Sequence, residues 1–156
     1  MNVPTPRALR LAPSVAAVAC VFGAAVSRAD GSPATALLSI RVVGLRNDSG
    51  QIGCGLWGSE KGFPKDHNLA LQTKWCPIVN KESSCSFDPI AAGTYAVACF
   101  HDENKNSVLD KGMFGIPTEG VVVSNEAKGF MGPPSFKAAK FSFAGAAAEL
   151  RLRMGY

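Results

Sequence analysis

The chain has 156 residues and a mass of 16.3 kDa, which fits one domain and excludes two full ones. Hydrophobic residues make up 47% and charged residues 18%, which excludes intrinsic disorder, and 16 Gly and 10 Pro indicate a chain rich in turns. The net charge is +4, but three arginines lie in residues 1–29 without any acidic residue, and the nearly neutral remainder excludes the basic footprint of a nucleic-acid binder.

The first 29 residues have the layout of a secretory signal peptide. Two arginines occur within the first ten residues, and residues 11–26 form an uncharged apolar run. The run is followed by small residues at the −3 and −1 positions of a cleavage before Asp30, namely Ser27 and Ala29. We therefore expect residues 1–29 to be removed on export.

Residues 30–156 are then expected to form a single domain that is periplasmic or secreted and has no stable membrane span. Two alternatives remain for the amino-terminal segment. It could be retained as a membrane anchor, although 16 uncharged residues that include Pro13 are short for a span of ~20 residues. It could also be lipidated at Cys20, although the apolar stretch continues beyond this residue.

Four cysteines remain after cleavage before Asp30, and none of them forms a C-x-x-C pair. In an exported domain an even number favours two disulfides over a zinc site. Cys76 and Cys85 flank a short polar stretch that can close a hairpin, whereas Cys54 and Cys99 lie inside apolar runs. Among the three connectivities we favour Cys76 with Cys85 and Cys54 with Cys99. The alternative is that some remain buried thiols.

Short runs typical of β-strands begin at Ala36 and are separated by clusters of turn residues. The predicted strands are residues 37–43, 51–57, one strand at Cys76, one at Cys85 that ends at Phe87, and residues 93–101, 119–124, 139–143 and 148–153. Residues 58–74 are predicted to be irregular, with a short helix from Pro64 through Leu71. About seven or eight strands indicate an all-β fold, an antiparallel β-sandwich. We detect no internal repeat.

Alternation predicts which faces of these strands are buried. Leu38, Ile40 and Val42 share one face of the first strand, and Leu150 and Leu152 share one face of the last. Gly53 and Gly55 share a face of the second strand, where we expect another group to approach closely.

The acidic segment after residue 101 has features of a calcium loop. Oxygen-bearing side chains recur with the 1, 3, 5, 9 spacing of such a loop, at Asp102, Asn104, Asn106 and Asp110. However, Ser107 replaces the turn glycine and Met113 replaces the bidentate glutamate, so Glu119 would have to contribute from outside the loop. The alternative, which we favour, is an Asx-rich loop that hydrogen-bonds its own backbone. No other cofactor is expected.

His101 lies beside Asp102, which could orient an imidazole for base catalysis. The chain contains no Gly-x-Ser-x-Gly nucleophile motif, so we assign no catalytic residue and favour His101 as a hydrogen-bonded turn residue. A metal-assisted hydrolase using His101, Asp102, Asp110 and Glu119 is the least favoured function.

A candidate ligand surface is formed by aromatic residues beside glycines and prolines, namely Phe114, Phe130 and Phe136. Rings next to rigid prolines can stack on a sugar or a peptide. The alternative is that Phe130 and Phe136 close the open end of the sandwich. Trp57 and Trp75 are better explained as core or rim packing.

Several motifs together resemble a known bacterial family, the exported proteins of the domain of unknown function 2141 family. These motifs are GTYAV at 93–97, HDENKN at 101–106, Leu109-Asp110, FGIPTEG at 114–120 and Ser124-Asn125. The resemblance covers about residues 36–156 and implies an exported, prealbumin-like β-sandwich without an assigned activity. The family usually has Asn-Gly-Asn-Gly in the acidic loop, and the Lys105 and Ser107 found here count against calcium.

The function that we expect is a non-enzymatic, exported binding or interaction module of the cell envelope. Its ligand, an envelope or extracellular partner, is not identified by the sequence and could be a protein, a glycan or a small apolar molecule. The alternative is a structural or accessory envelope domain that binds no small ligand.

Overall fold

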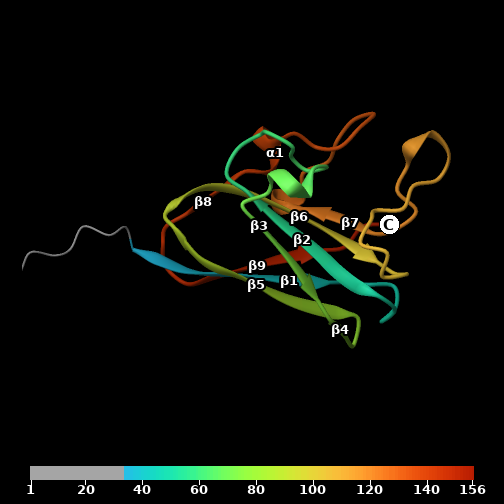
Figure 1. The fold of residues 1–156 in the computed structure, drawn as a ribbon, viewed down its shortest axis with the longest axis horizontal. Helices are drawn as coiled ribbons and strands as arrows, with labels where there is room; N and C mark the ends of the chain where they lie inside the picture. Colours follow the sequence, from blue (N-terminus) through green and yellow to red (C-terminus); the bar gives the residue numbers. More distant parts are fainter. Residues whose placement is uncertain (1–33) are drawn as a thin grey trace, which may run out of the picture. The chain divides into compact units, whose positions relative to one another are not determined.

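The computed structural model describes residues 34–156 (Figure 1), so the predictions for the signal peptide, its cleavage before Asp30 and Cys20 lie outside the described residues. Ser32–Tyr156 forms one compact unit. Its nine strands are arranged in a four-stranded and a five-stranded sheet that share one hydrophobic core. The predicted all-β sandwich is confirmed.

The four-stranded sheet has the order β4 (Ile78–Val79), β5 (Glu82–Ala91), β1 (Thr35–Val43) and β9 (Ala148–Arg153). β1 pairs antiparallel with β5 but parallel with β9, which is an exception to the antiparallel pairing that we predicted. The preceding strand, β8 (Phe141–Phe143), ends near the beginning of β1, where Gly145 lies against Ala34 and Ala92. The chain therefore enters the sheet beside Leu38 and runs in the same direction as β1.

The five-stranded sheet has the order β3 (Gln72–Cys76), β2 (Gln51–Trp57), β6 (Gly93–Asp102) and β7 (Val121–Val123), and β8 (Phe141–Phe143) pairs with the start of β6. All of these pairs are antiparallel. β7 is an edge strand, so the long connections on either side of it leave the sheet at this edge (Figure 1).

The inner faces of the two sheets form the main core, as the alternation of the sequence predicts. Leu38, Ile40 and Val42 of β1 are buried, and they share the core with Leu56 of β2 and Leu152 of β9. Arg41 and Arg151, at alternate positions of β1 and β9, are exposed. Burying each aliphatic side chain contributes roughly 1.5–3 kcal/mol, so this interface is the main source of stability.

The outer face of β2 is covered by aromatic rings, which explains its two glycines. A Cβ at Gly53 would lie 2.6 Å from the Trp75 ring, and one at Gly55 would lie 2.4 Å from the Trp57 ring. The predicted close approach is thus made by side chains. Trp57 is fully buried whereas Trp75 is 41% exposed, in agreement with core and rim packing.

Residues 58–71 lie over this outer face and contribute to a second, smaller core. Phe63 and Ala70 pack against the cluster that contains Trp57, and Phe63 makes an edge contact with the Trp57 ring at 5.3 Å. The helix predicted from Pro64 through Leu71 is wrong. Only the 3-10 turn η1 (His67–Leu69) forms, because the segment spreads over the sheet instead of coiling on itself.

β5 does not end at Phe87 as predicted but continues to Ala91 through a β-bulge. Leu38 pairs with Phe87 and Ala36 pairs with Ile90, so two residues of β5 lie opposite the single residue Leu37. One of the two is Pro89, which has no N–H to donate and is tolerated at a bulge for this reason. Asp88-Pro89, which follows Phe87, therefore marks an irregularity within β5 and not the end of a strand.

Both open sides of the sandwich are bridged. On one side the Cys76–Cys85 disulfide joins β3 to β5, and Lys74 forms a salt bridge with Asp88. On the other side the chain beyond β9 crosses to the second sheet, where Gly155 forms a β-bridge with Val121. The Cys54–Cys99 disulfide joins β2 to β6 within one sheet. Both disulfides follow the connectivity that we favoured.

Tyr95 ties the turn before β6 to its own strand. Its hydroxyl donates a hydrogen bond to the carbonyl of Ala91 at 3.0 Å, and its ring lies 3.1 Å from where a Cβ of Gly93 would stand. Gly93 and Tyr95 therefore both shape the turn that leads into β6.

Removing the two disulfides should destabilise the protein unequally. Cys54 and Cys99 are separated by 45 residues and Cys76 and Cys85 by 9. Because a longer closed loop restricts the unfolded chain more, we expect a loss of about 4 kcal/mol for the first double alanine variant and about 3 kcal/mol for the second. Chemical denaturation monitored by fluorescence measures both, and a larger loss for Cys76→Ala/Cys85→Ala would contradict the expectation.

Candidate functional site

The candidate metal ligands lie at the end of β6 and in the connection from β6 to β7, next to the buried residue His101 of β6. The Nδ1 atom of His101 lies 2.6 Å from the hydroxyl of Tyr156, and Nε2 lies 2.7 Å from the carbonyl oxygen of Ser49. Because a carbonyl only accepts, Nε2 carries the proton and Nδ1 accepts from Tyr156. The ring is fully buried and both nitrogens are occupied, which fits the structural role that we favoured.

Asp102 is also buried, and its carboxylate gathers three N–H donors. Oδ1 accepts from the backbone N–H of Asn106 at 3.0 Å. Oδ2 accepts from the backbone N–H of Ser107 at 2.9 Å and from the side-chain amide of Gln51 at 2.8 Å. These hydrogen bonds hold the first turn of the loop around the carboxylate of Asp102.

Glu119, at the far end of the connection, also accepts backbone N–H groups, and it joins the two sides of the loop. One carboxylate oxygen accepts from the N–H of Glu103 at 2.9 Å, and the other accepts from the N–H of Asp110 at 3.0 Å. The Asp110 carboxylate in turn accepts from the side-chain amides of Asn104 and Asn106, at 2.7 and 3.0 Å. Three carboxylates therefore organise the loop through N–H groups.

The arrangement supports the Asx-rich loop and gives no sign of a preformed calcium site. Asn104 and Asn106 direct amide nitrogens to Asp110, whereas a cation requires oxygen atoms. Among residues 34–156, no group of three or more His, Cys, Asp or Glu side chains could hold a metal ion. Calcium binding by this loop stays a prediction.

Glu103 and Arg46 close the polar cluster at the surface. Partial burial raises the pKa of Glu103, but hydrogen bonds from Asn47 and Arg46 outweigh it, so the pKa lies below its ordinary value. Arg46 also lies over the ring of Tyr156, with the guanidinium carbon 4.6 Å from the ring centroid. Burial raises the pKa of the Tyr156 hydroxyl, which therefore stays protonated as a donor to His101.

Two of the three phenylalanines predicted to form a ligand surface are exposed, and one is not. Phe114 and Phe130 are each 93% exposed. Phe136 packs edge-on against Phe63 at 5.7 Å and belongs to the second core, because the helix α1 (Phe136–Ala139) turns it toward the sheet. The alternative that Phe130 closes the sandwich end is therefore wrong.

Further exposed apolar side chains accompany Phe114 and Phe130. They are Met113, Ile116 and Met131, with exposed fractions of 79%, 64% and 94%. All of them lie in a repeated heptapeptide, so the expectation that the chain has no internal repeat is wrong. Residues 111–117 read KGMFGIP and residues 128–134 read KGFMGPP, with Lys, Gly, Gly and Pro at matching places and the Met–Phe pair in reversed order.

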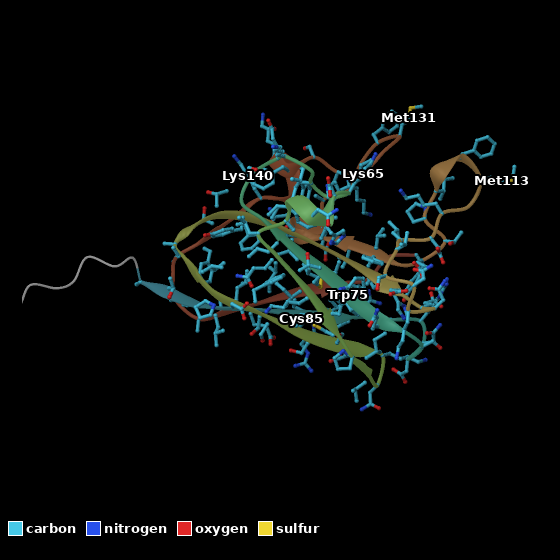
Figure 2. The ribbon with its side chains drawn as sticks, viewed as in Figure 1. Lys65, Trp75, Cys85, Met113, Met131 and Lys140 are labelled. Atoms are coloured by element: carbon cyan, nitrogen blue, oxygen red, sulfur yellow. A yellow bond between two sulfur atoms is a disulfide. The ribbon has the colours of Figure 1, made fainter. Side chains whose placement is uncertain are left out.

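We call residues 111–117 the first tip loop and residues 128–134 the second tip loop. The two tip loops also share one backbone feature. The second residue of each apolar pair has a left-handed conformation, with φ of 63° at Phe114 and 54° at Met131. In Figure 2, Met113 and Met131 both lie at the ends of loops that project away from the sheets. Each tip loop therefore presents a Met–Phe pair outward.

The first tip loop is a small hairpin on a fixed base. Its stem is closed by a bridge between Lys111 and Pro117 and by a 2.8 Å hydrogen bond from the N–H of Gly112 to the carbonyl of Ile116. Directly below, the N–H of Thr118 donates to the carbonyl of Asp110, whose own N–H donates to Glu119. The acidic cluster is thus the base that holds the first tip loop.

The second tip loop is fixed where it joins the second core. The Ser124 hydroxyl donates to the carbonyl of Ala139 at 2.7 Å, and the side chain of Asn125 donates to the carbonyl of Lys140 at 2.8 Å. These bonds join the residues before the loop to α1, which follows it. Within the loop, a Cβ at Gly129 would lie 1.8 Å from the carbonyl oxygen of Gly132, so the turn is too tight for another residue.

Comparison with known protein families identifies the family of this chain. A family model described as an uncharacterized protein conserved in bacteria, domain of unknown function 2141, matches residues 40–151. The chain belongs to this family. The match extends from β1 to β9 and includes the acidic loop and both tip loops, so these features lie within the family domain. No curated protein and no solved structure matches the chain significantly.

Glu119→Gln should loosen the base of the first tip loop. An amide can accept only one of the two backbone N–H bonds, and its own NH2 would face the other donor, so we expect a loss of about 1–3 kcal/mol. Thermal unfolding measures the stability, and proteolysis within residues 103–118 measures the opening. Glu149→Gln, an exposed change in β9, is the matched control. Equal stability of the two variants would contradict this role of Glu119.

Calcium should have little effect on the folded protein, because its candidate ligands already accept hydrogen bonds. We expect the thermal unfolding midpoint to be the same in a chelator and in about 1 mM calcium, since only a ligand that binds the folded state raises it. A clear rise that Asp102→Asn abolishes would instead establish a calcium site.

Proposed function

We propose that this protein is an exported binding module of the bacterial cell envelope and that the two tip loops form its binding surface. The observation that carries the proposal is the exposure of five large apolar residues on two loops, one with a hydrogen-bonded stem and one whose flanking residues are joined by hydrogen bonds. Folded proteins rarely expose a large apolar patch unless it binds something.

Export is supported by two features. Residues 1–29 have the pattern of a signal peptide, and the domain contains two disulfides, which are typical of proteins that fold in an oxidising compartment. Among the described residues no helix has the length and apolar character needed to cross a membrane. We infer a periplasmic or secreted protein.

A binding role is better supported than catalysis. His101 is buried with both ring nitrogens engaged, and Asp102, Asp110 and Glu119 accept hydrogen bonds from loop N–H groups. A general base needs access to the proton that it removes. These residues support the shape of the loop, and the exposed tips supply the surface.

The proposal is tested by capture from a native envelope extract. The variant Met113→Ser/Phe114→Ser/Phe130→Ser/Met131→Ser should fold normally, because all four side chains are exposed, but should lose the captured ligand. Leu71→Ser/Val79→Ser, which removes exposed apolar residues elsewhere, is the matched control and should retain it. Equal capture by wild type and both variants would favour the accessory domain without a ligand at the tips.

A further inference from the structure

We propose that the two tip loops insert together into the surface of an anionic phospholipid bilayer. This inference rests on the proposed function and names the ligand of the same surface. Its starting point is the repeated heptapeptide, in which a lysine precedes a Met–Phe or Phe–Met pair that is enclosed by glycines and followed by a proline.

The repetition itself favours a lipid surface over a protein. Two loops with the same residue types and the same left-handed turn at Phe114 and Met131 make the same kind of contact twice. A bilayer offers the same apolar layer at every point, whereas a protein partner offers pockets that differ from each other. The order of Met and Phe is reversed between the loops, which a layer without fixed positions tolerates.

The shape of the tips points the same way. The Met–Phe pairs lie at the ends of projecting loops, and a Cβ at Gly115 or Gly132 would meet no atom within 4 Å. The tips are therefore convex and open on their outer side. Two hollows at the surface lie away from the tips, one beside Arg41 and Val79 and one next to Phe143 and Leu150. A projecting apolar tip enters a soft layer without needing a matching cavity.

Charge supplies the second requirement of interfacial binding. Lys111 and Lys128 stand two residues before the apolar pairs, both are exposed, and neither forms a salt bridge within residues 34–156. The heptapeptides contain no acidic residue. The acidic residues nearest to them in the sequence are Asp110, which is bound by two asparagine amides, and Glu126, which is exposed. Apolar residues that enter the acyl region with lysines at headgroup level are typical of interfacial binding to anionic lipid.

The fixed bases of the loops make insertion efficient. The stem of the first tip loop is closed by backbone hydrogen bonds, and the second is tied to α1 by Ser124 and Asn125. A loop whose base is already fixed loses less conformational entropy when it binds. This entropy cost then cancels less of the free energy gained from the apolar contact. Two such loops on one domain also act together, because insertion of one raises the effective concentration of the other.

Insertion is measured directly with tryptophan reporters in the full chain. Phe114→Trp and Phe130→Trp should each be quenched by lipids brominated on their acyl chains, in vesicles of about three parts phosphatidylcholine to one part phosphatidylglycerol. Val79→Trp, at an exposed position in β4, is the matched control and should not be quenched. Trp57 and Trp75 give a background common to all variants. Quenching at the tips no stronger than at position 79 would overturn the proposal.

Vesicle sedimentation measures how much each part contributes. The serine variant of the four tip residues should partition about tenfold or more weakly than wild type, whereas Leu71→Ser/Val79→Ser should partition as wild type does. Lys111→Glu/Lys128→Glu should lose the preference for phosphatidylglycerol. Every variant is exported and purified in the same way, so the amino-terminal segment is the same in all of them and differences report the tips alone. Equal partitioning of all variants would also overturn the proposal.

The failure of this inference differs from the failure of the proposed function. If the tip reporters are not quenched but the serine variant loses a protein captured from the envelope, the binding surface stands and its ligand is a protein. If the serine variant changes neither vesicle binding nor capture, the tips are not a binding surface and both proposals are wrong.

Discussion

The arrangement of the functional loops depends on two buried or nearly buried carboxylates that satisfy backbone N–H groups. Asp102 and Glu119 lie at the beginning and the end of the β6–β7 connection, and together they accept from the N–H groups of four residues within it. A buried N–H without a partner is costly, so a long connection against a sheet needs such acceptors. The same oxygens that would bind a cation are used to shape the loop, and the first tip loop stands on the result.

The β-sandwich is the rigid framework to which both tip loops are attached. Its inner core contains side chains of both sheets, and its two sides are bridged, by Cys76–Cys85 on one and by the Gly155–Val121 bridge on the other. A second core on the outer face, built around Trp57, holds α1 and thereby the second tip loop. Each loop is thus attached to a different part of the domain, one to a polar cluster and one to an apolar cluster.

Regular alternation made much of the fold predictable from the sequence. β2 and β9 have the predicted bounds because each is bounded by clear turns and keeps its period of two. Features that depend on other parts of the chain were not predictable. Pro89 ends a strand by local rules, yet here it lies at a bulge opposite Leu37. Phe130 and Phe136 lie on either side of the same two prolines, and the contact of Phe136 with Phe63, which is distant in the sequence, distinguishes the packed ring from the exposed one. In the candidate site, the spacing of oxygen-bearing side chains located the acidic loop. It could not show that the amide nitrogens of Asn104 and Asn106 would bind the carboxylate of Asp110.

The parallel pairing of β1 with β9 has a consequence for biosynthesis. These are the first and last strands of the described domain, so the four-stranded sheet cannot be completed until nearly the whole polypeptide is available. Native contacts between distant parts of a sequence form slowly, because a large loop must close first. A topology of this kind delays the final assembly of the sheet until the last strand has been synthesised.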